Sequence, residues 1–233
     1  MQANDKTPAA PSMPFAEPTA LGLFGLAIGC ASLLPVAFGV KEAFAPEALR
    51  TCAWFCLLFG AGCQFLAGIM SFANKNMLGG TLLTTFSFNW VMNWWSLSEL
   101  SQGRVPSSAV ILAVDLCFLV VFLVMTYAFG FFSKLLFVFL LDIDLLYIFR
   151  IVREVGHVQA LALPIAIVTV ALMAIALYIA FALVLTNASG KALLPIGGPL
   201  FGAAAKPAHA PPHAMHAVAP DAEHTQPITA LSA

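Results

Sequence analysis

Charged residues are scarce in this chain. Asp, Glu, Lys and Arg together make up 9% of its 233 residues, whereas they make up roughly a quarter of a soluble globular protein. The formal net charge is -1, and no run of basic residues is present. These absences exclude a soluble globule and give no indication of nucleic acid or of an anionic lipid surface as a partner.

Several motifs are missing as well. The apolar stretches do not alternate with polar residues, as the strands of a membrane barrel do. The chain has no HExxH or GxSxG motif and no Ser or Cys nucleophile beside a His in an apolar block, so we expect neither an enzyme nor a cofactor. The five cysteines lie in or beside apolar blocks without clustered His or carboxylate partners, which indicates packing rather than a metal site.

Six long apolar blocks fill most of the chain. Each is close to the ~20 residues that a membrane-spanning helix needs, and backbone amides in lipid must find their hydrogen bonds within such a helix. The sequence therefore predicts an all-α fold, a polytopic membrane protein with a bundle of six transmembrane helices per protomer. The blocks are residues 20–40, 47–70, 80–98, 107–130, 134–152 and 160–186.

Short connectors between the blocks predict one transmembrane domain over residues 20–200. Pro46 and Pro106 suit the first turns of the helices that follow them. Residues 1–19 are polar and Pro-rich and lack the cationic start of a secretion signal, so we expect a flexible N-terminal tail. Residues 201–233 are rich in Ala, Pro and His, and we expect a disordered C-terminal tail whose histidines are solvated rather than bound to a metal. These histidines are His209, His213, His216 and His224.

Small residues indicate where the helices can approach closely. Gly25 and Gly29 have GxxxG spacing in the first block, and Gly60, Gly62 and Gly68 lie in the second. Lipid gives helices no hydrophobic reason to associate, so close backbone contact has to hold them together. We expect these faces to build the interior of the protomer.

Four segments of the sequence resemble a known family, in matching order and spacing, over about residues 16–198. They are Glu17-Pro18-Thr19-Ala20-Leu21-Gly22-Leu23, Gly62-Cys63-Gln64-Phe65-Leu66-Ala67-Gly68, Thr81 to Trp90, and Leu194-Pro195-Ile196-Gly197. In turn, they resemble the Asn-Pro-Ala-Pro-Leu-Gly-Leu signature, the G-x-x-Q-x-x-A-G segment, the Thr/aromatic stretch of the third helix, and the segment after the sixth helix. These belong to the acetate/succinate uptake transporter family, the YaaH-type acetate permeases.

The resemblance implies a homohexamer in the bacterial inner (cytoplasmic) membrane, with a path for a small monocarboxylate or succinate in each protomer. In relatives the path narrows at three apolar or aromatic residues of the first, third and fifth helices, and these positions fall on Leu26, Phe86 and Ile143. The family usually has Phe, Tyr and Leu there, so the tyrosine hydroxyl is absent and the substrate can differ from acetate. Lys and Arg divide equally between the two sides and do not orient the chain; we expect both termini to be cytoplasmic.

Three carboxylates, Asp115, Asp142 and Asp144, lie in apolar blocks. Inserting such a group into a membrane costs roughly 2.5–3.5 kcal/mol, so each is a candidate for a proton relay. The alternative is a static hydrogen bond between helices. Asp142 and Asp144 are about 200° apart around a helix axis, so we expect only one of them to face the path.

A helical stripe continues from Ile143 through Tyr147, Arg150 and Glu154, at spacings of four, three and four residues. Arg150 can attract a carboxylate into a mouth lined by Tyr147, because its guanidinium is permanently charged and its fork of donors matches a carboxylate. The alternative is an ordinary i,i+4 ion pair between Arg150 and Glu154 at the end of the helix.

Further polar residues are candidates for the path because amides and hydroxyls can bind a carboxylate or a protonated acid. Two of them, the asparagines, share a helix face with Phe86, while we expect Trp94 and Trp95 to form an interfacial belt. The alternative is that these polar groups bond neighbouring helices. The candidates are Gln64, Thr81, Thr84, Asn89 and Asn93.

The sequence thus favours membrane transport of small carboxylates, namely acetate and also succinate or related acids, by proton-linked uptake. Such acids have pKa values of roughly 4, so at neutral pH they are anions that cross lipid poorly and need a polar route. A gated anion channel for small carboxylates and a membrane scaffold or sensor without transport remain as alternatives.

Overall fold

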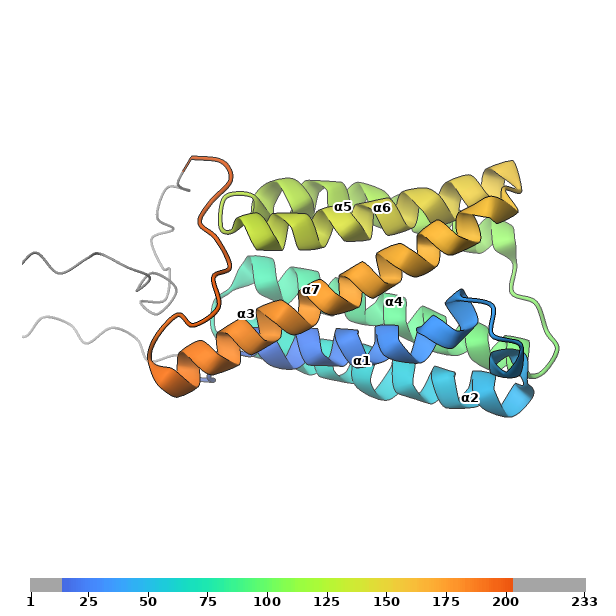
Figure 1. The fold of residues 1–233 in the computed structure, drawn as a ribbon, viewed down its shortest axis with the longest axis horizontal. Helices are drawn as coiled ribbons and strands as arrows, with labels where there is room; N and C mark the ends of the chain where they lie inside the picture. Colours follow the sequence, from blue (N-terminus) through green and yellow to red (C-terminus); the bar gives the residue numbers. More distant parts are fainter. Residues whose placement is uncertain (1–13, 203–233) are drawn as a thin grey trace, which may run out of the picture.

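The computed structural model describes residues 14–202, which form a bundle of six long helical segments without a strand (Figure 1). The predicted all-α class with six helices per protomer is confirmed. The second segment is continuous but has three parts: α2 (Pro46–Phe55), the π-helical stretch η2 (Cys56–Cys63) and α3 (Gln64–Ala73). The remaining elements are α1 (Thr19–Ala37), α4 (Met77–Ser101), α5 (Ser108–Phe129), α6 (Lys134–Gly156), α7 (Ala162–Ser189) and the 3₁₀ turns η1 (Lys41–Phe44) and η3 (Gln159–Leu161).

The helix bounds agree with the predicted blocks to about one turn. Pro46 opens α2 as expected. Pro106 does not open a helix: Ser107 is the N-cap residue, without a side-chain capping bond, and α5 begins at Ser108. Residues 1–13 and 203–233 lie outside the described part of the chain, and with them most of both predicted tails and the four tail histidines.

Four of the six segments are long and apolar enough to cross a membrane by length and composition. They are α1, the second segment Pro46–Ala73, α5, and η3 with α7, which together span Gln159–Ser189. The two others, α4 and α6, have 25 and 23 residues but carry more polar groups. These two helices also hold most of the predicted path residues. With its apolar helices, the chain is an integral membrane protein.

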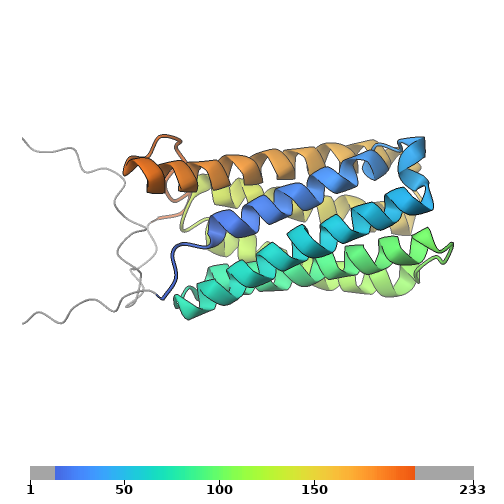
Figure 2. The ribbon, with the colours of Figure 1, turned by 90° about the horizontal axis from the view of Figure 1, so that it is seen from below.

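The helices divide into two groups that α7 joins (Figures 1 and 2). In the first group, α1 packs against η2 and α3, and α4 packs along the whole second segment. In the second, α5 and α6 form an antiparallel hairpin. The long helix α7 crosses from α6 to α1.

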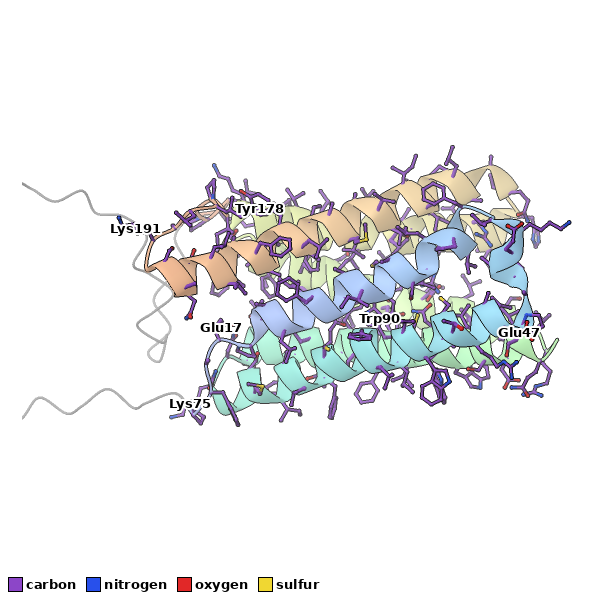
Figure 3. The ribbon with its side chains drawn as sticks, turned by 60° about the horizontal axis from the view of Figure 1, so that its bottom comes forward. Glu17, Glu47, Lys75, Trp90, Tyr178 and Lys191 are labelled. Atoms are coloured by element: carbon purple, nitrogen blue, oxygen red, sulfur yellow. The ribbon has the colours of Figure 1, made fainter. Side chains whose placement is uncertain are left out.

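Both described ends of the chain lie at one end of the bundle, which we call the terminal end; Glu17, Lys75 and Lys191 mark it, and Glu47 marks the opposite, distal end (Figure 3). The connectors after α1, α4 and α6 are all distal.

Close glycine contacts hold the first group together, as the sequence predicts. A side chain on Gly25 would meet the carbonyl of Phe59 in η2. The indole ring of Trp90 lies inside the bundle (Figure 3), against Gly60 of η2, where an added Cβ would stand 2.5 Å from the ring. Gly62 is the exception, since it is exposed and an added Cβ would have only ordinary contact at 3.5 Å.

The segment 190–202 returns from the end of α7 to the connector between α5 and α6. The hydroxyl of Ser133 donates a hydrogen bond of 2.6 Å to the carbonyl of Ile196, and the N–H of Lys134 donates one of 2.9 Å to the carbonyl of Gly198. The fourth family-like motif therefore caps the first turn of α6, whose N–H groups have no partner within the helix.

Candidate transport path

The three residues predicted to narrow the path point into the bundle from three helices. Leu26 of α1 and Ile143 of α6 are 0% exposed, and Phe86 of α4 is 3% exposed. All three belong to the same buried apolar cluster. None of them is exposed on the surface of the described bundle, and the constriction that they are predicted to form stays a prediction.

A series of aromatic rings connects this cluster to the distal half of α6. The ring of Phe86 meets Phe122 of α5 edge to face at 5.2 Å between centroids. Phe122 stacks with Tyr147 of α6 at 5.6 Å, and Phe118 stacks with both at 5.7 to 5.9 Å. The guanidinium carbon of Arg150 lies 5.6 Å from the centre of the Tyr147 ring, which is a cation–π distance.

Arg150 pairs with a carboxylate of the neighbouring helix. Its Nη2 lies 3.0 Å from Oδ2 of Asp115 on α5. The expected alternative, an ion pair with Glu154, is not among the salt bridges of residues 14–202. Asp115 is buried and Glu154 is exposed. The side chain of Arg150 therefore reaches across to α5 and does not run along α6 to Glu154.

The other two carboxylates of the apolar blocks differ in their bonding. Asp144 accepts a hydrogen bond of 2.6 Å from the hydroxyl of Thr126 on α5. Asp142 is also buried, but no side-chain hydrogen bond holds it among residues 14–202. Asp144 is therefore tied to the neighbouring helix, whereas Asp142 is not.

Each of the three carboxylates keeps an oxygen without a hydrogen-bond partner in the described chain. These buried atoms are Oδ1 of Asp115, Oδ2 of Asp142 and Oδ1 of Asp144. Buried polar groups in native proteins are nearly always bonded. The three carboxylates of this hairpin therefore stay the candidates for a proton relay that the sequence predicts.

The candidate amides and hydroxyls are partly accounted for by local bonds. The amide of Asn93 donates to the backbone carbonyl of Asn89 at 3.0 Å, so it bonds its own helix rather than a neighbour. Asn89 is buried and makes no side-chain hydrogen bond within residues 14–202. Oε1 of Gln64 and Oγ1 of Thr84 are buried without a partner there, and Thr81 is half-buried.

The tryptophans of α4 differ in burial, and the interfacial belt of Trp94 and Trp95 stays a prediction. Trp95 is exposed and Trp94 is half-buried near the distal end of α4. Trp90 is 3% exposed, and its Nε1 has no partner in the described residues.

Sequence reasoning missed the α5 wall of the site. Phe118 and Phe122 were not predicted as site residues. Phe118 follows Asp115 by three residues and Phe122 follows Phe118 by four, so all three share one helix face. That spacing was the available signal. It is masked because nearly every residue of α5 is apolar, so no face stands out.

Comparison with known proteins identifies the fold. The bacterial acetate channel SatP superimposes with a TM-score of 0.70 and 20% sequence identity, over 78% of this chain and 99% of the channel. The chain thus has the fold of that channel, which is consistent with the resemblance to the acetate/succinate uptake transporter family. No family model and no curated protein matches the sequence.

Proposed function

We propose that this protein transports small carboxylates, with acetate as the first candidate, through a path inside each protomer. The observation that carries the proposal is the convergence of Leu26, Phe86 and Ile143, all buried, inside a bundle that has the fold of an acetate channel. The similar solved structure is a channel rather than an enzyme, which supports a transporter that performs no chemistry on its substrate.

The three side chains form the narrowest part of this path. They lie in one buried apolar cluster. A ring of such hydrocarbon groups can block water and ions by dewetting. A small acid can pass such a ring because its methyl group is apolar, whereas its charged end needs polar groups on either side. Gln64, Asn89 and Thr84 are the buried polar groups available for that purpose.

Uptake is linked to protons in this proposal, and Asp142 is the relay. It is buried next to Ile143 in the chain, and one of its oxygens has no partner in the described residues. Asp144 is held by Thr126 and serves as an interhelical contact. A carboxyl group that gains and loses a proton beside the constriction couples the proton to the acid that passes it.

Several finer features rest on the resemblance. We place the protein in the bacterial inner membrane as a homohexamer, with both termini cytoplasmic and succinate among its substrates. Native mass spectrometry of the detergent-extracted full chain is expected to give six copies; a monomer at all detergent concentrations would contradict the hexamer.

Uptake into liposomes tests the transport function. The full chain, reconstituted into proteoliposomes, is expected to take up labelled acetate faster than empty liposomes, with saturation and with acceleration by an imposed pH gradient. A panel of monocarboxylates and dicarboxylates gives the substrate range. Absence of uptake for every acid would leave a scaffold or sensor and contradict the proposal.

The gated channel is the second candidate, because the similar solved structure is a channel. A high unitary conductance in planar bilayers, with flux that does not saturate, favours it over the carrier. Saturating flux that follows the pH gradient favours the carrier.

A further inference from the structure

The ion pair between Arg150 and Asp115 is held by a single contact. One nitrogen, Nη2, lies 3.0 Å from one oxygen, Oδ2. No hydrogen bond from Arg150 occurs among the described residues, whereas Arg104 donates two to Glu99. Because a guanidinium has five N–H donors arranged to match a carboxylate, most of the binding capacity of Arg150 is unused.

The carboxylate of this pair is also incompletely satisfied. Asp115 is 4% exposed, and its Oδ1 has no hydrogen-bond partner in the described chain. The hydroxyl of Tyr147, one turn inward from Arg150, is likewise buried without a partner there. In this pair, the guanidinium of Arg150 has N–H donors without a partner in the described chain, and the carboxylate of Asp115 has an oxygen without one.

The position of Arg150 suits an entrance. Its side chain is 29% exposed near the distal end of α6, so part of the guanidinium is not covered by the described bundle. Inward of it lies Tyr147, whose ring continues through Phe122 to Phe86. A carboxylate bound at Arg150 thus stands where the aromatic series toward the constriction begins.

The two other ion pairs of the described chain, also distal, differ in kind. Arg50 with Glu47 and Arg104 with Glu99 each join residues three or five apart, and both arginines are exposed. The Arg150–Asp115 pair alone among the three joins two helices and includes a buried carboxylate. These surface pairs provide matched controls for the same functional groups at the same end of the bundle.

We propose that Asp115 occupies Arg150 in place of the substrate, and that an incoming small monocarboxylate displaces Asp115 from the guanidinium at the distal mouth of the path. This inference rests on the proposed transport function and specifies its binding site. Arg150 binds the acid, and Asp115 weakens this binding because it competes for the same guanidinium. When Asp115 pairs with Arg150 again, the acid is released inward.

The arrangement also predicts a preference among acids. After displacement, Asp115 stays in the same buried region, and its charge repels a second carboxylate on the substrate. A dicarboxylate such as succinate therefore binds less well than acetate. Without the charge of Asp115, this discrimination weakens.

Uptake kinetics of the full chain in proteoliposomes test the inference, with labelled acetate and succinate as probes. Asp115→Asn removes the competing charge with little change in shape, so the KM for acetate is expected to fall several-fold while the maximal rate does not rise, and the ratio of succinate to acetate uptake is expected to increase. Arg150→Gln is expected to raise the KM for acetate by about tenfold or more, since a hydrogen-bonded charge is lost.

Arg150→Gln alone leaves Asp115 buried and unpaired, which can prevent folding. The double variant with both Asp115→Asn and Arg150→Gln removes both charges and is expected to bind acetate as weakly as Arg150→Gln. Arg104→Gln removes an exposed arginine at the same end and is expected to leave the KM for acetate unchanged.

An unchanged KM for acetate and an unchanged succinate-to-acetate ratio in Asp115→Asn would overturn the inference and make the pair a structural tie between α5 and α6. A double variant with the wild-type KM would overturn it equally. Wild-type chain without any acid uptake contradicts the transport function itself and the inference with it, so the two failures are distinguishable.

Discussion

Phe86 is the side chain whose size bears most directly on the proposed passage. It is 3% exposed, and its ring lies between Phe122 of α5 and Trp90 of its own helix, with centroids 5.2 and 6.2 Å away. Two residues further on, Phe88 of the same helix is 52% exposed. The two phenylalanines therefore differ in position but not in chemistry.

Phe86→Ala is expected to widen the constriction and to admit larger acids. In proteoliposomes, the uptake rate of butyrate relative to acetate should rise, and the variant should be destabilised by about 3–5 kcal/mol, the usual cost of emptying a buried phenyl site. Phe88→Ala, with the same change on the outer surface, should alter neither. An unchanged substrate range in Phe86→Ala would remove this ring from the constriction.

Asp142→Asn is expected to abolish the acceleration of acetate uptake by an imposed pH gradient while leaving uptake driven by the acetate gradient alone. The amide has nearly the shape of the carboxyl group but cannot carry its proton. Uptake with and without a pH gradient measures the effect. Glu47→Gln, which neutralises an exposed distal carboxylate, is the control, and an equal response to the gradient in both variants would exclude Asp142 as the relay.

Spacing in the sequence correctly predicted which residues of α6 share one face. The stripe from Ile143 through Tyr147 to Arg150 is one face of α6, and it runs from fully buried to partly exposed. Its partner could not be predicted, because the contact of Arg150 with Asp115 depends on how α5 and α6 are rotated against each other. Spacing within one helix carries no information on that rotation.

At the scale of elements, the second segment and α1 pack so closely that only glycine fits at their points of contact. Gly25 of α1 lies against the carbonyl of Phe59, and Gly60 lies against the ring of Trp90. The GxxxG spacing predicted the close approach. The π-helical stretch Cys56–Cys63 packs against α1 and α4, and it could not be predicted because the continuous apolar sequence of this block does not distinguish a wider turn from an α-helical one.

Gly25→Ala is expected to destabilise the bundle by about 1–3 kcal/mol, the usual cost of overpacking, because the new methyl group would stand too close to both the Cβ of Cys63 and the carbonyl oxygen of Phe59, and neither is the far end of a flexible side chain. Thermal unfolding in detergent, followed by circular dichroism, measures it. Gly62→Ala is the control in the same segment, since the space there is open and alanine favours helix. Equal stability of the two variants would contradict the close contact of α1 with η2.

At the scale of the whole molecule, the even number of spanning segments puts both described ends of the chain on one side (Figure 1). The sequence predicted the six segments because each apolar block has the length of a span. It did not predict which segments are neighbours. That arrangement depends on α7, which crosses from α6 to α1, and no pattern within α7 itself specifies its partners.

A protease-cleavable tag fused after residue 233 is expected to be cut in inverted inner-membrane vesicles and protected in intact spheroplasts, because we place the termini in the cytoplasm. The same tag inserted between residues 102 and 107, in a distal connector, should give the opposite result. Cleavage of both tags from one side would contradict the six-span topology, and reversal of both would turn the protein over in the membrane.

The backbone of the α5–α6 hairpin comes close to the rest of the described bundle mainly along α7. Elsewhere the two groups meet through side chains, as Phe122 and Phe86 do between α5 and α4. If the proposed passage runs between these rings, we expect it to widen by rotation of the rings, with every helix left in place. Exchange of a single ring should then change the size of the acid that passes without altering the scaffold.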